Sequence, residues 1–293
     1  MLDKWRLKIG YLEIGEGGGV LMDEKTILAA LETRWLGQIV HAFAEVGSTN
    51  TVLAGLAQRE APQGTMVIAD YQSHGRGRRQ RRWEAPPRSS LLLSLLFRPD
   101  WPAVRASWLT MIAGLAAVDA MQTCTPLQAA LKWPNDVMIW DTAPGSAGWC
   151  KVGGLLLETR LDGDQLRQAI IGIGLNVNIP RDQLPQTGSA GTGTPAGSLL
   201  ATSGQYVPRL RLLTHFLQRL ETLYERAAAG QSPQPAWDAR LLTRDQPVRV
   251  TGAKGIVEGT ALGSDEWGRL LVRAADGELH RFAAGDVTLG SYC

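Results

Sequence analysis

Residues 132–137 read KWPNDV and separate two apolar segments, 127–133 and 137–140, that are expected to form strands. Proline has no backbone N–H to contribute to a β-ladder, so Pro134 ends the first of them. The two polar residues that follow it are therefore predicted to lie at a strand end rather than in the centre of a sheet. A tight turn accounts for them, and so does a site where they hold magnesium and orient phosphate or ribose oxygens.

The segments around this stretch predict a sheet with helices packed against it. Apolar runs favour buried strands at 65–71 (TMVIADY), 90–97 (SLLLSLLF), 152–159 and 166–177, with a turn at 143–148 and a mobile surface loop at 188–198. Helices are expected at 48–59, with Ser48 as N-cap, at 106–122, with its apolar residues on one face, and at 210–224, followed by Gly230. The pattern indicates an α+β class with a central mixed, largely antiparallel sheet.

Beyond Pro235 the pattern changes to five short strand-like segments separated by glycine and aspartate, which fits a small β-barrel of about 50 residues. We therefore expect a main domain over residues 41–240 and a small C-terminal barrel over 241–293. Residues 1–40 form an N-terminal extension without a predicted role, and GEGGG at 15–19 is typical of a flexible link. A winged-helix DNA-binding domain, which needs two helices and a hairpin, has no room in this extension.

Composition narrows the class of protein. The 293 residues are 44% hydrophobic and 20% charged, with a net charge of +2, which argues against a dedicated nucleic-acid binder. The N-terminal residues lack the continuous apolar core of a signal peptide, and the most apolar helical stretch, 106–118, is shorter than the roughly 20 residues that span a bilayer. Three scattered cysteines and four scattered histidines offer neither a disulfide framework nor a metal-ligand cluster. The composition predicts a soluble cytoplasmic protein with free thiols.

The positive charge is concentrated in residues 75–83, GRGRRQRRW, which contain five arginines. Glycines let a backbone come close to a ligand, and the arginine fork matches carboxylate and phosphate oxygens. This segment alone is compatible with a solvated surface loop, a nucleic-acid-binding arm or a phosphate-binding loop. Trp83, at its end, is interpreted first as a core anchor.

Two further motifs place glycines inside apolar strands. KVGGLLLE at 151–158 and GIGLNVN at 172–178 both interrupt β-rich runs, and each glycine weakens a strand by roughly 0.5–1 kcal/mol relative to alanine. Another group lying flat on that backbone would explain them. Lys151 supplies a point charge for a phosphate or carboxylate, and the asparagines at 176 and 178 suggest a hydrogen-bonding task, with a bulge and turn as the alternative.

Together and in this order, these motifs resemble the biotin protein ligases, also called biotin–acetyl-CoA-carboxylase ligases. The motifs cover residues 44–180, and the layout covers 41–293. The resemblance is carried by Ser48-Thr49-Asn50, Gln72, the GRGRR loop with Trp83, KWPNDV, KVGGLLLE and GIGLNVN. It implies a class II synthetase-like catalytic fold with a small SH3-like barrel after it.

The resemblance also implies the reaction and its participants. Such an enzyme joins biotin and ATP, with magnesium, into biotinyl-5′-adenylate and pyrophosphate, then transfers biotin to one lysine of a biotin carboxyl carrier protein. Two anions must meet in the first step, so the reaction needs concentrated positive charge rather than a protein nucleophile. The layout is similar to that of the monofunctional class, so neither DNA binding, membrane binding nor a tightly held prosthetic group is expected. A homodimer that pairs through the central sheet stays open.

By resemblance, each predicted site residue receives a role. The biotin-binding residues are Ser48, Thr49, Asn50, Gln72, Arg76, Gly77, Arg78, Lys151, Gly153 and Gly154. The ATP-binding residues are Arg78, Arg81, Trp83, Lys132, Asn135, Asp136 and Asn176, with Asp136 as the magnesium ligand. Lys151 and Arg78 are the predicted catalytic residues, because they would steady the charge where carboxylate and phosphate meet.

One departure and two rival functions accompany this interpretation. The family usually has glycine where this chain has Gln80, so a position with positive φ would carry a cost of roughly 1 kcal/mol and would affect loop closure. Lipoate ligases and octanoyltransferases share the fold, but they should lack the GRGR and KWPND motifs. A nucleic-acid-binding regulator would need several more phosphate contacts than this loop offers.

Overall fold

The computed structural model describes residues 22–143, 147–185, 194–252 and 255–289. Its larger sheet has eight strands in the order β1-β2-β3-β8-β7-β6-β5, with β4 on β8. They are β1 (Val40–Val46), β2 (Met66–Gln72), β3 (Ser90–Phe97), β4 (Trp101–Pro102), β5 (Ala129–Lys132), β6 (Asp136–Asp141), β7 (Gly148–Asp162) and β8 (Gln165–Asn176). β1 and β2 are parallel, while the other pairings are antiparallel. The predicted mixed, largely antiparallel sheet is confirmed, and β3 has the predicted bounds.

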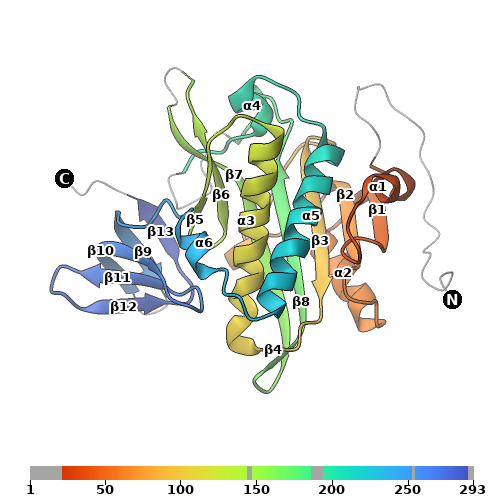
Figure 1. The fold of residues 1–293 in the computed structure, drawn as a ribbon. Helices are drawn as coiled ribbons and strands as arrows, with labels where there is room; N and C mark the ends of the chain where they lie inside the picture. Colours follow the sequence, from red (N-terminus) through yellow and green to blue (C-terminus); the bar gives the residue numbers. More distant parts are fainter. Residues whose placement is uncertain (1–21, 144–146, 186–193, 253–254, 290–293) are drawn as a thin grey trace.

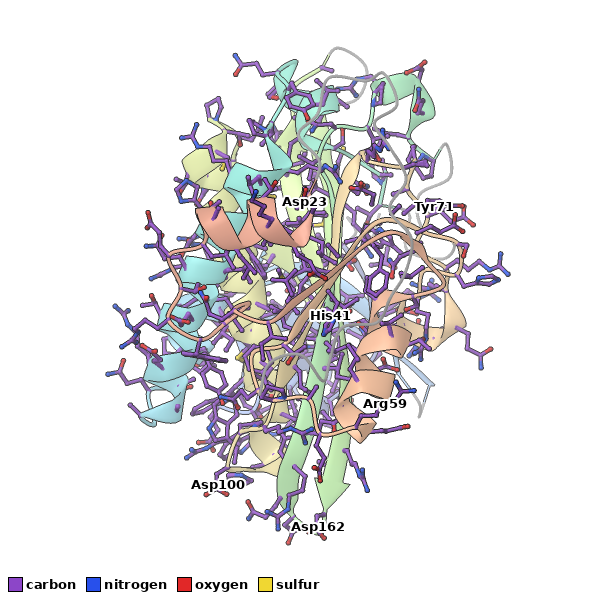
Figure 2. The ribbon with its side chains drawn as sticks, turned by 90° about the vertical axis from the view of Figure 1, so that its right-hand side faces the viewer. Asp23, His41, Arg59, Tyr71, Asp100 and Asp162 are labelled. Atoms are coloured by element: carbon purple, nitrogen blue, oxygen red, sulfur yellow. The ribbon has the colours of Figure 1, made fainter. Side chains whose placement is uncertain are left out.

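Helices cover both faces of this sheet. α3 (Ala106–Cys124) and α5 (Arg209–Ala228) lie side by side across one face. α2 (Thr49–Gln58) lies on the opposite side, as Figure 2 shows beside the labelled Arg59. Strand β3 explains both contacts, because its odd-numbered leucines join the main core while Leu96 joins the smaller cluster under α2. The short helices are α1 (Glu24–Ala30), α4 (Leu199–Ser203) and α6 (Gln234–Asp238).

Between Trp108 and Met121, helix α3 has buried residues on all its sides, whereas the sequence analysis expected a single apolar face. Its side chains pack on β5–β8 and on α5, and Gly114 leaves room for the ring of Trp237 from α6. The expectation that this stretch is too short to span a bilayer is also wrong, since residues 103–124 form a helical stretch of 22 residues that is apolar enough. Of its most apolar window, 67% is buried within the protein, which is the pattern of a core helix.

The second sheet confirms the five predicted C-terminal strands. β9 (Pro247–Gly252), β10 (Gly255–Ser264), β11 (Leu270–Ala274), β12 (Leu279–Phe282) and β13 (Asp286–Leu289) pair antiparallel in the order β12-β11-β10-β9-β13. Three side chains of the main domain fix this barrel by donating to the β10–β11 turn. They are Ser107 to Trp267 O (2.6 Å), Trp108 to Glu266 O (2.8 Å) and Trp133 to Gly268 O (2.9 Å). Because Trp133 belongs to the KWPND motif, the motif and the barrel are held together.

The described part of the N-terminal extension joins the main core. Ile27 of α1 and Leu36 are fully buried in it. The buried carboxylate of Glu221 accepts hydrogen bonds from the backbone N–H groups of residues 34–36 at 2.9–3.1 Å. Residues 15–19, residues 144–146 of the predicted 143–148 turn, residues 188–193 of the predicted 188–198 loop, and Cys293 lie outside the described residues. Cys124 and Cys150 are free thiols.

Candidate active site

A cavity of about 350 Å³ collects the four sequence motifs on the sheet face opposite α3 and α5. Its lining includes the predicted residues Ser48, Thr49, Asn50, Gln72, Arg76, Gly77, Arg78, Arg81, Trp83, Lys132, Asn135, Asp136, Lys151, Gly154 and Asn176. The side chains come from the start of α2, the ends of β2 and β5, the arginine loop, the start of β6, the first half of β7 and the end of β8. Antiparallel pairing of β6, β7 and β8 brings together motifs that lie up to 40 residues apart.

Neutral polar groups form one end of the cavity, at the start of α2. Gln72 Oε1 accepts from the backbone N–H of Thr49 at 2.8 Å, and the Asn50 amide donates to Glu158 at 2.7 Å. Ser94 Oγ lies 2.5 Å from Asn50 Oδ1 and 2.7 Å from Thr49 Oγ1. Ser48 occupies the predicted N-cap position but makes no capping bond with its side chain, so its hydroxyl is available to a ligand. We call this end the polar floor.

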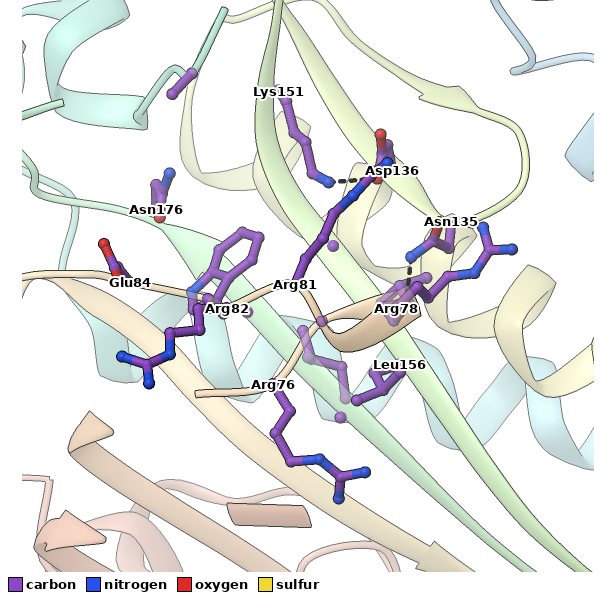
Figure 3. A pocket seen from close by; sticks show the side chains of 18 of the residues that line it. Arg76, Arg78, Arg81, Arg82, Glu84, Asn135, Asp136, Lys151, Leu156 and Asn176 are labelled. Atoms are coloured by element: carbon purple, nitrogen blue, oxygen red, sulfur yellow. Dashed lines mark hydrogen bonds and ion pairs between the residues drawn. The ribbon is translucent and has the colours of Figure 1, made fainter. Parts of the chain in front are cut away.

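Charged groups form the other end of the cavity. Lys151 Nζ lies 2.6 Å from Asp136 Oδ1, and the two side chains point toward one another in Figure 3. Arg78 donates to Asn135 Oδ1 at 3.1 Å, while Asn135 donates to Leu155 O at 2.7 Å. Pro134 thus leaves these polar residues at the strand end, as predicted.

Lys132 and Arg78 are charged groups with little access to water. Burial lowers the pKa of the Lys132 ammonium, Asp136 raises it, and the nearby Lys151 lowers it again. Burial likewise lowers the pKa of the Arg78 guanidinium, with Asp286 acting in the opposite direction. Lys132 Nζ donates to Thr194 Oγ1 at 2.9 Å. This end of the cavity therefore concentrates cations where a polyanion would relieve their mutual repulsion.

The arginine loop closes over the cavity as a compact turn. Gly77 N–H donates to Arg81 O (2.7 Å) and Trp83 N–H donates to Gly75 O (3.0 Å) around the single turn η2 (Arg78–Gln80). Gln80 has φ +61°, so the position where the resemblance implies a glycine is left-handed, which is the condition under which glutamine carries a cost. Arg79, with φ +54°, precedes it in the same conformation.

Trp83 lies flat on the glycine-bearing strands. A Cβ on Gly174 would come within 2.6 Å of its ring, and one on Gly154 within 3.2 Å. These glycines therefore admit a flat group, as predicted, and in this structure the group is an indole. Trp83 Nε1 and Asn176 Oδ1 are buried without a hydrogen-bond partner in the described part of the chain, which leaves one donor and one acceptor for a ligand.

Gly153 does not line the cavity, although it was predicted to bind biotin. Side chains alternate along β7, so Gly153 faces the opposite side of the sheet from Gly154. A Cβ there would collide with Leu175 and crowd Val137. The glycine is required by packing between strands. Asn178 also lies outside the lining, because its amide pairs with the backbone of Val207 at 2.9 and 3.0 Å.

Sequence reasoning missed Glu158, Ser94 and Asp286, which hold predicted site residues in place by hydrogen bonds. Glu158 shares its strand face with Gly154 and Leu156, so counting by twos along KVGGLLLE would have found it. Ser94 is a single hydroxyl inside the apolar run SLLLSLLF, which is a weaker signal. Asp286, from β13 of the barrel, accepts from Arg79 (2.6 Å) and Arg81 (2.9 Å). No local pattern marks Asp286, since its position depends on how the barrel packs.

The fold and the cavity are those of the protein ligases that attach biotin or lipoate. A model described as the biotin/lipoate A/B protein ligase family matches residues 42–176, and one described as the biotin protein ligase C-terminal domain matches residues 244–290. The chain is 32% identical over 283 residues to the bifunctional ligase/repressor BirA of Bacillus spizizenii, covering 96% of this chain and 82% of that protein.

It is 34% identical over 253 residues to the biotin--[acetyl-CoA-carboxylase] ligase of Mycobacterium tuberculosis, covering 83% of this chain and 86% of that one. The solved structure of the Aquifex aeolicus biotin protein ligase in complex with biotin and ATP is similar, with a TM-score of 0.66 and 26% identity, over 86% of this chain and 99% of that chain. The chain belongs to the biotin protein ligase family, which confirms the resemblance and the predicted fold.

Proposed function

We propose that this cavity forms biotinyl-5′-adenylate from biotin and ATP, as expected of an ATP-dependent biotin ligase. The observation that carries the proposal is the division of the cavity into a neutral polar floor and a cationic end. Biotin has a cyclic urea that needs hydrogen-bond donors and acceptors, and a carboxylate tail that needs positive charge. The floor fits the ring, and the cationic end fits the tail together with a triphosphate.

The chain supplies electrostatic help rather than a nucleophile. The biotin carboxylate attacks the α-phosphorus, the bond to the β-phosphate oxygen breaks, and pyrophosphate leaves. Lys151 and Arg78 reduce the repulsion between the two anions and stabilise the charge that builds up on the α-phosphate oxygens. Lys132 adds charge on the leaving side, where its own burial favours an anionic partner. Trp83 covers the reacting groups and excludes water.

Magnesium fits this donor set as an ion held mainly by the nucleotide. The described residues contain no group of three His, Cys, Asp or Glu side chains that could hold a metal alone. Asp136 places one carboxylate in the cavity beside Asn135, which suits Mg²⁺ because it binds through one or two carboxylates and substrate phosphates. When bound, the ion would neutralise phosphate charge, while Lys151 continues to hold Asp136 in place.

In the second step the bound biotinyl-5′-adenylate donates its acyl group to a carrier protein. Biotin protein ligases act on the biotin carboxyl carrier proteins of carboxylases. The amine of the carrier lysine attacks the acyl carbon, AMP leaves, and an amide forms. We propose the same partner here, in the cytoplasm and without DNA or membrane. We also propose residues 41–240 as the catalytic domain and 241–293 as the barrel, and a homodimer stays a prediction.

Intact mass spectrometry of a purified biotin carboxyl carrier domain tests this function. The protein is incubated with the carrier, biotin and magnesium ATP, and pyrophosphate is read from the same tube. We expect a single biotinyl addition that requires ATP and disappears when the carrier lysine is changed. Lipoate or octanoate in place of biotin tests the rival acyl ligase, and we expect no addition. No pyrophosphate release by folded protein would refute the proposed reaction.

A further inference from the structure

Glu158 joins the polar floor to the arginine loop. One carboxylate oxygen accepts from Asn50 Nδ2 at 2.7 Å, and the other accepts from Arg76 at 2.7 Å. Asn50 is 3% exposed and forms part of the floor, whereas Arg76 stands at the mouth of the cavity with its side chain 49% exposed. A single side chain therefore contacts both the buried end of the cavity and the loop that closes it.

The charge of Glu158 determines which atoms of the floor donate and which accept. A carboxylate only accepts, so Asn50 must turn its NH₂ group toward Glu158 and its oxygen toward Ser94. The Ser94 hydroxyl then donates to that oxygen, and Ser94 Oγ also lies 2.7 Å from Thr49 Oγ1. Hydrogen bonds thus link Glu158 through Asn50 and Ser94 to Thr49 at the start of α2.

Gly172 makes room for the Asn50 amide. A Cβ on Gly172 would collide with Asn50 Oδ1, so the amide lies directly on the bare backbone of β8. Ser94, on the neighbouring strand β3, is fully buried and pairs with Gly172 in register. The relay is therefore held by strands β3 and β7 and by helix α2, and Glu158, with its side chain 33% exposed, is the member that reaches toward solvent.

We propose that Glu158 is a positioning residue that couples occupation of the polar floor to closure of the arginine loop. This inference rests on the proposed function, with a cyclic urea as the group on the floor. A ligand that bonds to Thr49 and Asn50 fixes the relay, the relay fixes Glu158, and Glu158 holds Arg76 over the ligand. Without the negative charge of Glu158, the Asn50 amide is no longer held in one orientation, and Arg76 loses the ion pair that connects the loop to the floor.

Glu158→Gln tests the proposal because it keeps the shape and removes the charge. We expect the KM for biotin to rise about tenfold, while the KM for ATP and the unfolding midpoint stay close to those of the unchanged protein, since hydrogen bonds to charged groups are the stronger ones. Asp162→Asn is the matched control. It removes a carboxylate from the same strand, at the far end of the β7–β8 hairpin, where its side chain is 71% exposed.

Trypsin provides a second readout that a merely structural role would not change. Five arginines make the loop a sensitive cleavage site, so biotin alone should slow cleavage of the unchanged protein and of Asp162→Asn. In Glu158→Gln we expect biotin to give little protection even at saturating concentration. Ser94→Ala, which interrupts the relay behind Asn50, should reduce the protection in the same way, and the two changes together should add little further.

The outcomes separate this inference from the function it depends on. If the unchanged protein does not biotinylate the carrier, the proposed function fails first. If it does, and Glu158→Gln retains both the biotin KM and the biotin-dependent protection, then Glu158 is not the coupling residue and the inference is overturned. A higher KM with full protection would also overturn it, because the loop would then close without Glu158.

Discussion

A methyl group at Gly174 should displace Trp83 and open the site. The added Cβ would lie 2.6 Å from Cε2, 2.9 Å from Nε1 and 3.0 Å from Cδ2 of the ring. Carbon atoms in contact prefer about 3.5–4.0 Å, so the indole must withdraw by about 1 Å. Overpacking of this kind costs about 1–3 kcal/mol. Gly174→Ala places that strain on the closed form of the loop, since Trp83 N–H bonds to Gly75 O at the base of the loop.

The strain converts directly into a kinetic expectation. Each 1.4 kcal/mol changes an equilibrium about tenfold, so we expect kcat/KM for pyrophosphate release to fall by about 5- to 140-fold in Gly174→Ala. The assay follows pyrophosphate at subsaturating ATP and biotin, where loop closure contributes to the measured rate. The unfolding midpoint, measured in parallel, reports whether the β8 backbone itself is disturbed.

Gly55→Ala is the matched control for this change. A Cβ at Gly55, inside α2, meets nothing within 4 Å, and alanine favours a helix over glycine by about 1 kcal/mol. This variant should retain full activity and unfold at the same or a higher temperature. If folded Gly174→Ala releases pyrophosphate as fast as Gly55→Ala, Trp83 does not lie over Gly174 in the reacting complex and the reasoning is refuted.

Three further predictions concern charge and loop geometry. Lys151→Ala should slow pyrophosphate release by about 10²-fold or more, with a normal rate contradicting its role. Gln80→Gly should relieve about 1 kcal/mol of left-handed strain and lower the KM for ATP by up to about fivefold; an unchanged KM would show that this strain does not oppose closure. Burial raises the pKa of Glu221, but the hydrogen bonds from the backbone of residues 34–36 together lower it by more. The pKa in the folded protein is therefore below its ordinary value. The charged form therefore stabilises the fold above the unfolded pKa, and this contribution is lost as the pH falls through the folded value. Unfolding free energies from pH 7 to 3 should show Glu221→Gln destabilised at neutral pH and the gap closing in acid, whereas a pH-independent gap would contradict this.

Much of the fold follows from local patterns because its strands are long and apolar. The β3 run SLLLSLLF lies between turns and has both faces covered, so its bounds could be predicted to the residue. The burial of helix α3 on all its sides was harder to predict. Its sequence places small residues such as Gly114 between large ones, and only the tertiary structure shows that Trp237 fills the space above them.

The candidate site likewise has a part that sequence patterns predict and a part that depends on tertiary packing. Motifs on adjacent strands converge because the register of β6, β7 and β8 brings them together, and period-two counting could identify which residues share a face. The bulge where Val137 and Met138 pair with β7 shifts that count between Lys151 and Gly153. Gly153 was misplaced for a simpler reason, because the resemblance assigned both adjacent glycines to biotin although neighbours in a strand face opposite sides. Asp286 could not be predicted, since it reaches the loop only through the docking of the barrel on residues 107, 108 and 133.

The arginine loop is partly compensated in charge before any substrate arrives. Arg76 pairs with Glu158, and Arg79 and Arg81 share Asp286. These pairs are partly exposed, so each contributes about 1 kcal/mol or less, whereas consecutive left-handed residues such as Arg79 and Gln80 cost about 1 kcal/mol each. The closed loop is therefore close to balance without a ligand. A triphosphate carries more charge than either carboxylate and offers oxygens to several arginines at once, so substrate binding is enough to decide the balance in favour of closure.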